Sequence, residues 1–61
     1  PIDFVRHIRI MKSTEMLQGS DDSLTTIAFN VGFSDPKYFS KVFKKEMGIT
    51  PTEYRERTQK V

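Results

Sequence analysis

The sequence predicts an all-α fold, a small domain of four helices. Apolar residues recur at intervals of three and four positions, and clusters of Gly, Pro, Ser and Asp separate the stretches in which they do so. No stretch shows the strict alternation of apolar and polar residues that marks a half-buried strand. A chain of 61 residues allows only one small domain, and its five Phe and two Tyr supply one modest core.

The first helix is expected over residues 1–18. Pro1 suits a first helical turn, and the polar residues 19–22 interrupt the pattern. One stripe, with Ile2 and Val5 close to it, should face the core: Ile10, Ser13, Thr14 and Leu17. Because a helix turns by about 100° per residue, other apolar residues cannot all share that stripe, and part of their surface should stay exposed: Val5, Ile8 and Met11.

A short second helix is expected after Ser23, a good N-cap residue. Its inward positions have the spacing i, i+3, i+4 and i+7: Leu24, Ile27, Ala28 and Val31. Gly32 should end this helix, because glycine takes the left-handed conformation at the C′ position without a clash from Cβ. Phe33 and Ser34 then complete a tight turn.

The third helix is expected over residues 36–47 and should end at Gly48. Asp35 is its N-cap and Pro36 its first residue, because proline loses no hydrogen bond there and drives the preceding residue out of the α region. The helix has a stripe for the core, Phe39, Val42, Phe43 and Met47. The other side is cationic and polar: Lys37, Ser40, Lys41, Lys44 and Lys45.

The fourth helix is expected over residues 50–60. Thr50 and Glu53 have the spacing of a capping box, in which each side chain bonds the backbone amide of the other residue. Tyr54 is expected to anchor this helix in the core. Residues after Thr58 should fray, because they offer no apolar contacts.

The composition excludes several kinds of site. The chain has no cysteine and one histidine, His7, so it offers no disulfide and no metal cluster. It has no paired nucleophile and base and no phosphate loop, so we expect neither an enzyme nor a cofactor. Asp21 and Asp22 fit a solvated loop better than a catalytic carboxylate pair. No apolar run approaches the roughly 20 residues of a membrane span, and no signal peptide is visible. A cytoplasmic location is therefore expected, and because the chain begins at Pro1 we expect it to be part of a longer protein.

The charge is distributed unevenly along the chain. Residues 1–36 hold three basic and five acidic side chains, and residues 37–61 hold seven and three, so the two parts carry formal charges of −2 and +4. A polyanion would be drawn to the second part, as in many nucleic-acid-binding domains. A basic face that is merely solvated gives the same count.

Residues 23–48 follow the plan of a helix-turn-helix motif, in which a short helix and a glycine-containing turn precede a longer basic helix. In such a motif the first helix crosses the phosphate backbone and the second enters the major groove of DNA. Small or polar side chains near the start of the second helix then reach base edges, here Pro36, Lys37, Ser40 and Lys41. Pro36 has no donor, which leaves it an apolar contact such as one with a thymine methyl group.

A long string of residues resembles the signature of AraC/XylS-type transcription regulators. It comprises residues 32–45 (GFSDPKYFSKVFKK), residues 48–51 (GITP) and the pair Tyr54 and Arg55. Residues 23–28 also resemble the first helix of that family's second motif, and residues 4–17 resemble its linker helix. The likeness covers essentially the whole chain.

The resemblance implies a homeodomain-like helix-turn-helix domain in which a long linker helix joins two motifs that bind successive major-groove segments of a promoter. This chain would hold the linker helix (1–18), the second motif (23–48, recognition helix about 36–47) and the C-terminal helix (50–60). The implied base-facing residues are Pro36, Lys37, Ser40 and Lys41. The implied phosphate contacts are Tyr38, Lys44, Lys45 and Ser23.

The implied partners are double-stranded promoter DNA and the first motif of the same protein. We expect that motif to cover the exposed apolar surface of the first helix, although a few scattered exposed apolar residues are also normal in a protein. RNA polymerase is a further candidate partner, and neither a membrane nor a small molecule is expected to bind this segment. A second interpretation stays open, a protein-interaction module whose basic helix meets an acidic partner such as polymerase or a sensory or two-component receiver domain. Tyr38 likewise fits either a core position or a DNA contact.

Overall fold

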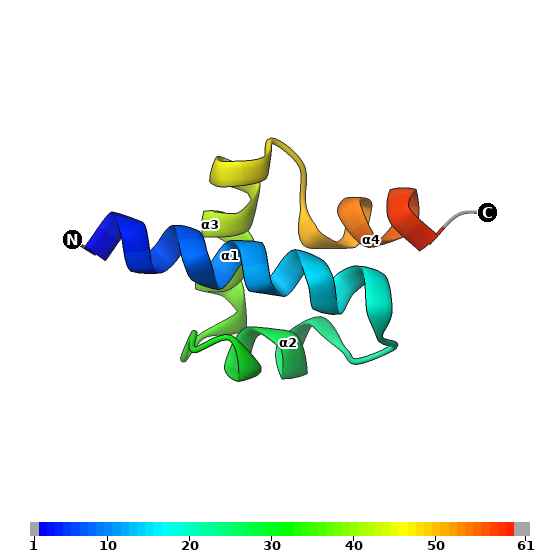
Figure 1. Ribbon diagram of the computed structural model, residues 1–61, viewed down its shortest axis with the longest axis horizontal. Coiled ribbons are helices and arrows are strands. Elements are labelled where there is room, and N and C mark those ends of the chain that lie inside the picture. The colour runs from blue at the N-terminus through cyan, green and yellow to red at the C-terminus, as the bar shows by residue number, and fades with distance from the viewer. Residues whose placement is uncertain (1, 60–61) are drawn as a thin grey trace.

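The computed structural model describes residues 2–59, and within that range the chain forms four helices and no strand (Figure 1). In chain order these are α1 (Ile2–Gly19), α2 (Leu24–Asn30), α3 (Pro36–Met47) and α4 (Pro51–Gln59). The predicted all-α class is confirmed. We expected Pro1 in the first helix and Lys60 in the last, and both lie outside the described residues.

The central element of the fold is α1. It contacts α2, α3 and α4, and Figure 1 shows it lying across α3, with α2 below it and α4 beside its C-terminal half. Its predicted inner stripe is buried: Ile10, Ser13, Thr14 and Leu17. The Ser13 and Thr14 hydroxyls donate to the carbonyls of Ile10 and Met11, each at 2.6 Å. Their burial therefore leaves neither hydroxyl without a partner.

The core draws one or more residues from α1, α2, α3 and the turn before α3. Its buried members are Ile10, Leu17, Ile27, Ala28, Val31, Phe33, Phe39, Val42 and Phe43. Four half-buried residues pack against them: Met16, Leu24, Met47 and Tyr54. The Tyr54 ring meets the Phe43 ring edge-on at 5.6 Å, and its hydroxyl accepts a hydrogen bond from the Gln18 amide at 2.6 Å. Tyr54 is the anchor of α4, as predicted.

The C-terminus of α1 is capped by side chains of α4. Arg55 donates to the carbonyls of Leu17 (3.4 Å) and Ser20 (3.2 Å), and Gln59 donates to the same two carbonyls at 3.0 and 3.3 Å. The last carbonyls of a helix have no partner within the helix, so these bonds tie the two helices together. The expected fraying beyond Thr58 is therefore wrong for Gln59, because polar contacts hold this residue where no apolar contact was foreseen.

The start of α4 is the predicted capping box. The Thr50 amide donates to the Glu53 carboxylate at 3.1 Å, and the Glu53 amide donates to the Thr50 hydroxyl at 3.1 Å. The Thr50 hydroxyl also bonds the same carboxylate at 3.0 Å. These bonds from the backbone and side chain of Thr50 lower the pKa of Glu53 from its ordinary value of 4.5, and the nearby charges of Arg57 and Lys44 lower it further.

The side of α1 that is turned away from the core is partly apolar. Four large apolar side chains on it are between 40% and 61% exposed: Phe4, Val5, Ile8 and Met11. The predicted exposure of Val5, Ile8 and Met11 is confirmed. None of the helices within residues 2–59 combines the length and the apolar character that crossing a membrane requires.

We predict that Arg55→Ala lowers the free energy of unfolding by about 1.5–3 kcal/mol, because hydrogen bonds from a charged donor contribute that much. Gln59→Ala should cost about 0.5–1.5 kcal/mol, the usual range for a neutral donor. Urea denaturation followed by circular dichroism measures both. The matched control is Arg57→Ala, an exposed arginine of the same helix, which should change stability by less than about 0.5 kcal/mol. An equal loss for Arg55→Ala and Arg57→Ala would contradict the capping role.

The capping box predicts a dependence of stability on pH. Because the folded state lowers the pKa of Glu53, this group stabilises the fold above pH 4.5, and the contribution disappears as the pH falls through the lowered folded value. Thermal unfolding between pH 6 and pH 3 should show a steeper acid loss for the wild type than for Glu53→Gln. Glu56→Gln removes a carboxylate of the same helix outside the capping box and should keep the steeper wild-type loss. Parallel curves for wild type and Glu53→Gln would refute the coupling.

Candidate nucleic-acid interface

A glycine turn fixes the angle between α2 and α3. Gly32 has φ +106°, the region that favours glycine. The Gly32 amide donates to the Phe29 carbonyl at 3.1 Å, and the Phe33 amide donates to the Ala28 carbonyl at 2.9 Å. This pair of bonds is the Schellman motif, whose apolar contact is supplied by the buried Phe33 and Ala28. The predicted end of the second helix at Gly32 is confirmed. The turn then leads the chain into α3.

The start of α3 is fixed by Asp35 and Pro36. Asp35 has the extended backbone of an N-cap (φ −136°, ψ 116°), and its carboxylate accepts a hydrogen bond from the Lys37 amide at 3.0 Å. Pro36 is the first helical residue. At the other end Gly48 takes a left-handed conformation with φ +85°. Both predicted boundaries of the third helix are confirmed.

A row of aromatic rings holds the inner side of α3. Phe39 and Phe43 are fully buried, and their ring centroids lie 5.9 Å apart. Phe33 from the turn continues the row, at 5.3 Å from Phe39, and Tyr54 closes it at the other end. Rotation of α3 about its axis would expose these rings, so their packing determines which side chains of α3 face the solvent.

The outer side of α3 carries the four predicted lysines, all exposed: Lys37, Lys41, Lys44 and Lys45. The pairs Lys37/Lys41 and Lys41/Lys45 are four residues apart, where like charges repel by about 0.2–0.5 kcal/mol per pair. Within residues 2–59 the close contacts between basic and acidic side chains are Arg6 with Asp3 and His7 with Glu46, so no lysine of α3 has an acidic partner there. This face costs the free domain a little stability and would gain from an anionic ligand.

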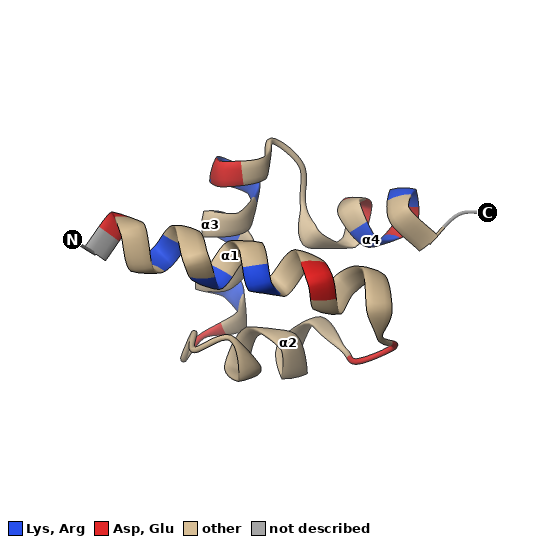
Figure 2. Cartoon of the chain, viewed as in Figure 1, with Lys and Arg blue, Asp and Glu red and all other residues tan. Residues whose placement is uncertain are grey.

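Glu46, the acidic residue of α3, lies next to α1. Glu46 contacts His7 of α1, with Oε1 and Nδ1 3.1 Å apart. This contact keeps the carboxylate on the side of α3 next to α1. Figure 2 shows Lys and Arg positions on α3 and on the part of α1 that crosses it, and Arg6 of α1 lines one hollow with Lys41 and Lys45 of α3. The carboxylate therefore lies at the border of the cationic surface, where Glu46 and Asp3 line one hollow with Arg6 and Lys45.

The four predicted base-facing residues differ in exposure. Lys37 and Lys41 are exposed at the centre of the outer face, one helical turn apart, whereas Pro36 and Ser40 are half-buried at its border. Their spacing, i, i+1, i+4 and i+5, brings all four to one side of the first two turns of α3.

The four predicted phosphate-contacting residues fall into two groups. Tyr38 and Lys45 lie on the flank of α3 toward α1, where Arg6, Lys41 and Val42 complete a hollow of about 270 Å³, and Lys44 lies one turn after Lys41. Ser23 lies apart from these, at the far end of α2 from the turn. Its hydroxyl accepts a bond from the Thr26 amide at 3.1 Å, which confirms the predicted N-cap.

Tyr38, for which the sequence left open a core position or a DNA contact, packs partly against the core and is partly exposed. Its ring packs edge-on against the buried Phe33 at 5.8 Å, yet 44% of the residue is exposed. The Arg6 guanidinium carbon lies 5.9 Å from the centre of the ring, within reach of a cation–π interaction. Tyr38 therefore anchors to the core by one edge and remains accessible from the surface.

Two basic residues of the interface were missed by sequence reasoning. Arg6 and Arg9 lie in the part of the chain with net negative charge, but α1 carries them to the turn and to α3, where they line one cavity with Tyr38. The sequence did contain a signal for them. Arg6 and Arg9 are three positions apart, and residues at that spacing share one side of a helix. The crossing of α1 over α3, which is not a local property, decides that this side meets the interface.

Comparison with known proteins gives a consistent result. A family profile described as "Helix-turn-helix domain", of the AraC type, matches residues 1–57. The HTH-type transcriptional activator RhaS of Escherichia fergusonii is 41% identical over 56 residues, which cover 92% of this chain and 20% of that protein. The HTH-type transcriptional activator RhaR of Yersinia pestis is 43% identical over 54 residues, 88% of this chain and 19% of that protein.

A third relative is named as a kinase and not as a transcriptional activator. Histidine kinase P4 of Formosa agariphila is 37% identical over 57 residues, which cover 93% of this chain and 4% of that protein. The chain thus spans a fifth or less of the length of these three relatives. No solved structure matches it.

Proposed function

Because the chain belongs to the AraC-type helix-turn-helix family, we propose that it binds double-stranded DNA in the regulation of transcription, with α3 in the major groove. The observation that carries the proposal is the outward set of four lysines on α3, none of which has an acidic partner within residues 2–59. A buried aromatic row holds the opposite side of the same helix. The major groove admits one α-helix, and its floor and walls offer acceptors to lysine.

The base-facing residues in this proposal are Pro36, Lys37, Ser40 and Lys41. Lys37 and Lys41 are long, exposed donors that suit guanine O6 and N7, whereas the Ser40 hydroxyl can serve either as donor or as acceptor. Pro36, without a donor, offers an apolar surface to a thymine methyl group. Because these residues occupy the first two turns of α3, the N-terminal half of the helix reads the bases.

Phosphate contacts come from residues around this set: Tyr38, Lys44, Lys45 and Ser23. The first three flank the base-facing residues on α3, and Ser23 stands at the start of α2, the helix that crosses the backbone in this motif. Such contacts fix the position of the protein on the duplex and read no sequence.

The chain acts, in this proposal, as the second motif and linker helix of a longer regulator. The exposed apolar side of α1 would pack against the first motif, and RNA polymerase is a further partner. The names of the relatives support a transcriptional role, and the match to a protein named a histidine kinase supports an arrangement in which such a domain is the output of a two-component system.

DNA binding by the 61-residue chain should be weak and strongly dependent on salt. We predict a Kd on the order of 10⁻⁴ to 10⁻⁶ M at physiological salt, because a single motif makes few contacts beyond those with phosphates. Lys44→Ala should weaken binding on every duplex and reduce the slope of log K against log salt by about 0.9. Lys41→Ala should also relax the preference at one base pair, by about 1–3 kcal/mol. Fluorescence anisotropy on a panel of labelled duplexes measures both.

The control is Lys12→Ala, which removes an exposed lysine that lies beside Ile8 and Met11 on α1. It should leave both the affinity and the salt slope as in the wild type. Binding that ignores salt, or no binding at low salt, would contradict the proposal and favour a module that recognises an acidic protein.

The exposed apolar side of α1 gives a separate test of the first-motif contact. Ile8→Ser should raise the solubility of the 61-residue chain but lower the thermal midpoint of a longer version that includes the segment preceding Pro1. The drop should be about 4–8 °C per kcal/mol of lost contact for a domain of this size. Phe29→Ser changes an exposed apolar residue of α2, which is 53% exposed against 40% for Ile8, and should not destabilise the longer version. An unchanged midpoint for Ile8→Ser would show that nothing covers this surface.

A further inference from the structure

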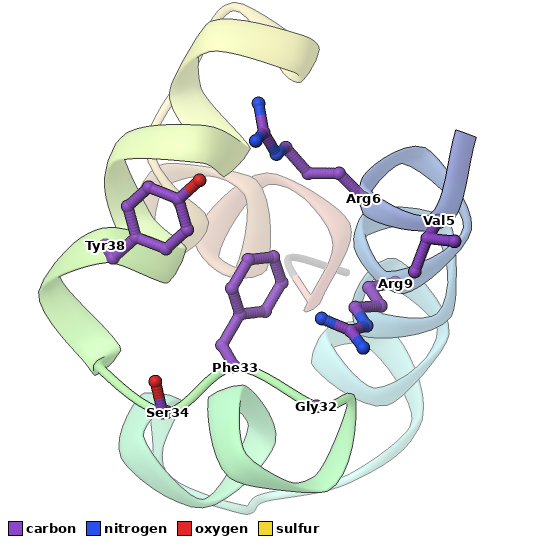
Figure 3. A pocket seen from close by; sticks show the side chains of 7 residues that line it. All are labelled: Val5, Arg6, Arg9, Gly32, Phe33, Ser34 and Tyr38. Carbon is purple, nitrogen blue, oxygen red and sulfur yellow. The ribbon is translucent and has the colours of Figure 1, made fainter. Parts of the chain in front are cut away.

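A second cationic site lies next to the lysines of α3. A cavity of about 150 Å³ separates the first half of α1 from the turn and from the start of α3 (Figure 3). Its polar lining consists of Arg6, Arg9, Ser34 and Tyr38, and Val5, Gly32 and Phe33 complete the lining. Two guanidinium groups and two hydroxyls thus surround the cavity, and no carboxylate lines it.

Arg9 has less anionic compensation than Arg6, which shares a neighbouring hollow with Asp3 and Glu46. Arg6 is paired with Asp3, at the long distance of 3.7 Å, and the Asp3 side chain is 88% exposed, so this pair contributes little. Arg9 has no acidic partner within residues 2–59. Two positive groups three residues apart on one side of α1 repel each other, and they remain available to a ligand with negative charge.

Gly32 makes room for Arg9. A Cβ atom at position 32 would lie 3.0 Å from Arg9 Nε and 3.2 Å from Arg9 Cζ, tighter than ordinary contacts. The absence of a side chain therefore lets the guanidinium lie against the turn, as Figure 3 shows. Gly32 thus ends α2 and leaves the space beside the turn in which the Arg9 side chain lies.

Arg6 connects this cavity to the side of α3 that carries the four lysines. Its guanidinium carbon lies 5.9 Å from the centre of the Tyr38 ring, and only 28% of its side chain is exposed, so its position is restrained. The same residue lines the neighbouring hollow with Lys41 and Lys45. A ligand in the cavity would therefore lie beside the surface that meets DNA.

We propose that Arg6 and Arg9, assisted by the hydroxyls of Ser34 and Tyr38, bind one phosphodiester group of the DNA strand that borders the groove entered by α3. This inference rests on the proposed function. The planar fork of arginine matches the two unesterified oxygens of a phosphodiester, and each such bond is strengthened by charge. The hydroxyls of Ser34 and Tyr38 can donate to acceptor sites of the phosphate oxygens that the arginines leave free. The linker helix α1 thereby becomes a DNA-contacting element, in addition to supporting α2 and α3.

The salt dependence of DNA binding tests this site. The double variant Arg6→Gln/Arg9→Gln should reduce the slope of log K against log salt by about 0.9, because the slope counts neutralised phosphates and the two arginines share one. Arg6→Gln and Arg9→Gln should each reduce the slope by part of that amount. Lys12→Gln removes the same charge from another side of α1 and should keep the wild-type slope. Arg9→Lys keeps the charge and should therefore keep the slope. It should still weaken binding, because lysine lacks the planar guanidinium that can donate two bonds to one phosphate. A residue with a purely structural role would not change the slope.

Tyr38→Phe supplies a variant that keeps the ring and its packing. It should weaken binding about 2- to 10-fold through loss of one hydrogen bond, with the slope unchanged. Circular dichroism verifies that each variant is folded. Competition by inorganic phosphate at constant ionic strength, present in the wild type and absent in the double variant, would confirm the chemistry of the site.

The outcomes separate this inference from the proposed function. If the wild type and Lys44→Ala show the predicted salt slopes but the arginine variants keep the wild-type slope, the phosphate site is refuted and DNA binding by α3 stands. The phosphodiester contact is refuted as well if inorganic phosphate binds while the slope on DNA does not change, because the cavity then takes a free phosphate. If the wild type does not bind DNA, both proposals fail.

Discussion

The packing of Phe39 and Phe43 against α1 and the turn supports every other feature of this domain. Both rings are fully buried, and truncation of such a ring to alanine usually costs about 3–5 kcal/mol. A folded chain of 61 residues has a total stability of roughly 3–9 kcal/mol at usual values per residue. The orientation of α3 is therefore coupled to folding itself, since the lysines could not turn inward without the loss of a large part of the free energy that holds the fold.

The long helix α1 contributes through polar contacts at both ends as well as through its buried stripe. Its C-terminal carbonyls accept bonds from Arg55 and Gln59 of α4, and its first half holds His7 against Glu46 of α3. Contacts at two places along one rigid helix fix α3 and α4 relative to each other. The surface that carries the lysines of α3 therefore keeps its shape because α1 does.

The sequence was sufficient for the features that local chemistry determines. The caps at Ser23, Gly32, Asp35 and Thr50 each act over two to five residues, so residue type and spacing predicted the helix ends. The two faces of α3 followed from helical periodicity in the same way. The contacts of Arg55 with Leu17 and of Arg6 with Tyr38 join residues more than 30 positions apart, and their existence depends on how the helices cross. Tyr38 remained ambiguous because it lies on the boundary between the two faces, where helical periodicity alone does not decide burial.

The distribution of charge in space differs from the distribution along the chain. The acidic pair Asp21 and Asp22 contributes much of the negative charge of the first part, but it lies in the loop between α1 and α2, at the far end of α2 from the turn (Figure 2). Arg6 and Arg9 belong to the same acidic part by number, yet they line a cavity beside α3. The fold therefore brings two basic residues of the acidic part beside the lysines of α3, although Asp3 and Glu46 line a neighbouring hollow with Arg6 and Lys45. The charge count along the chain does not show this arrangement, because it depends on how α1 crosses α3. A surface rich in positive charge attracts a polyanion before any contact forms.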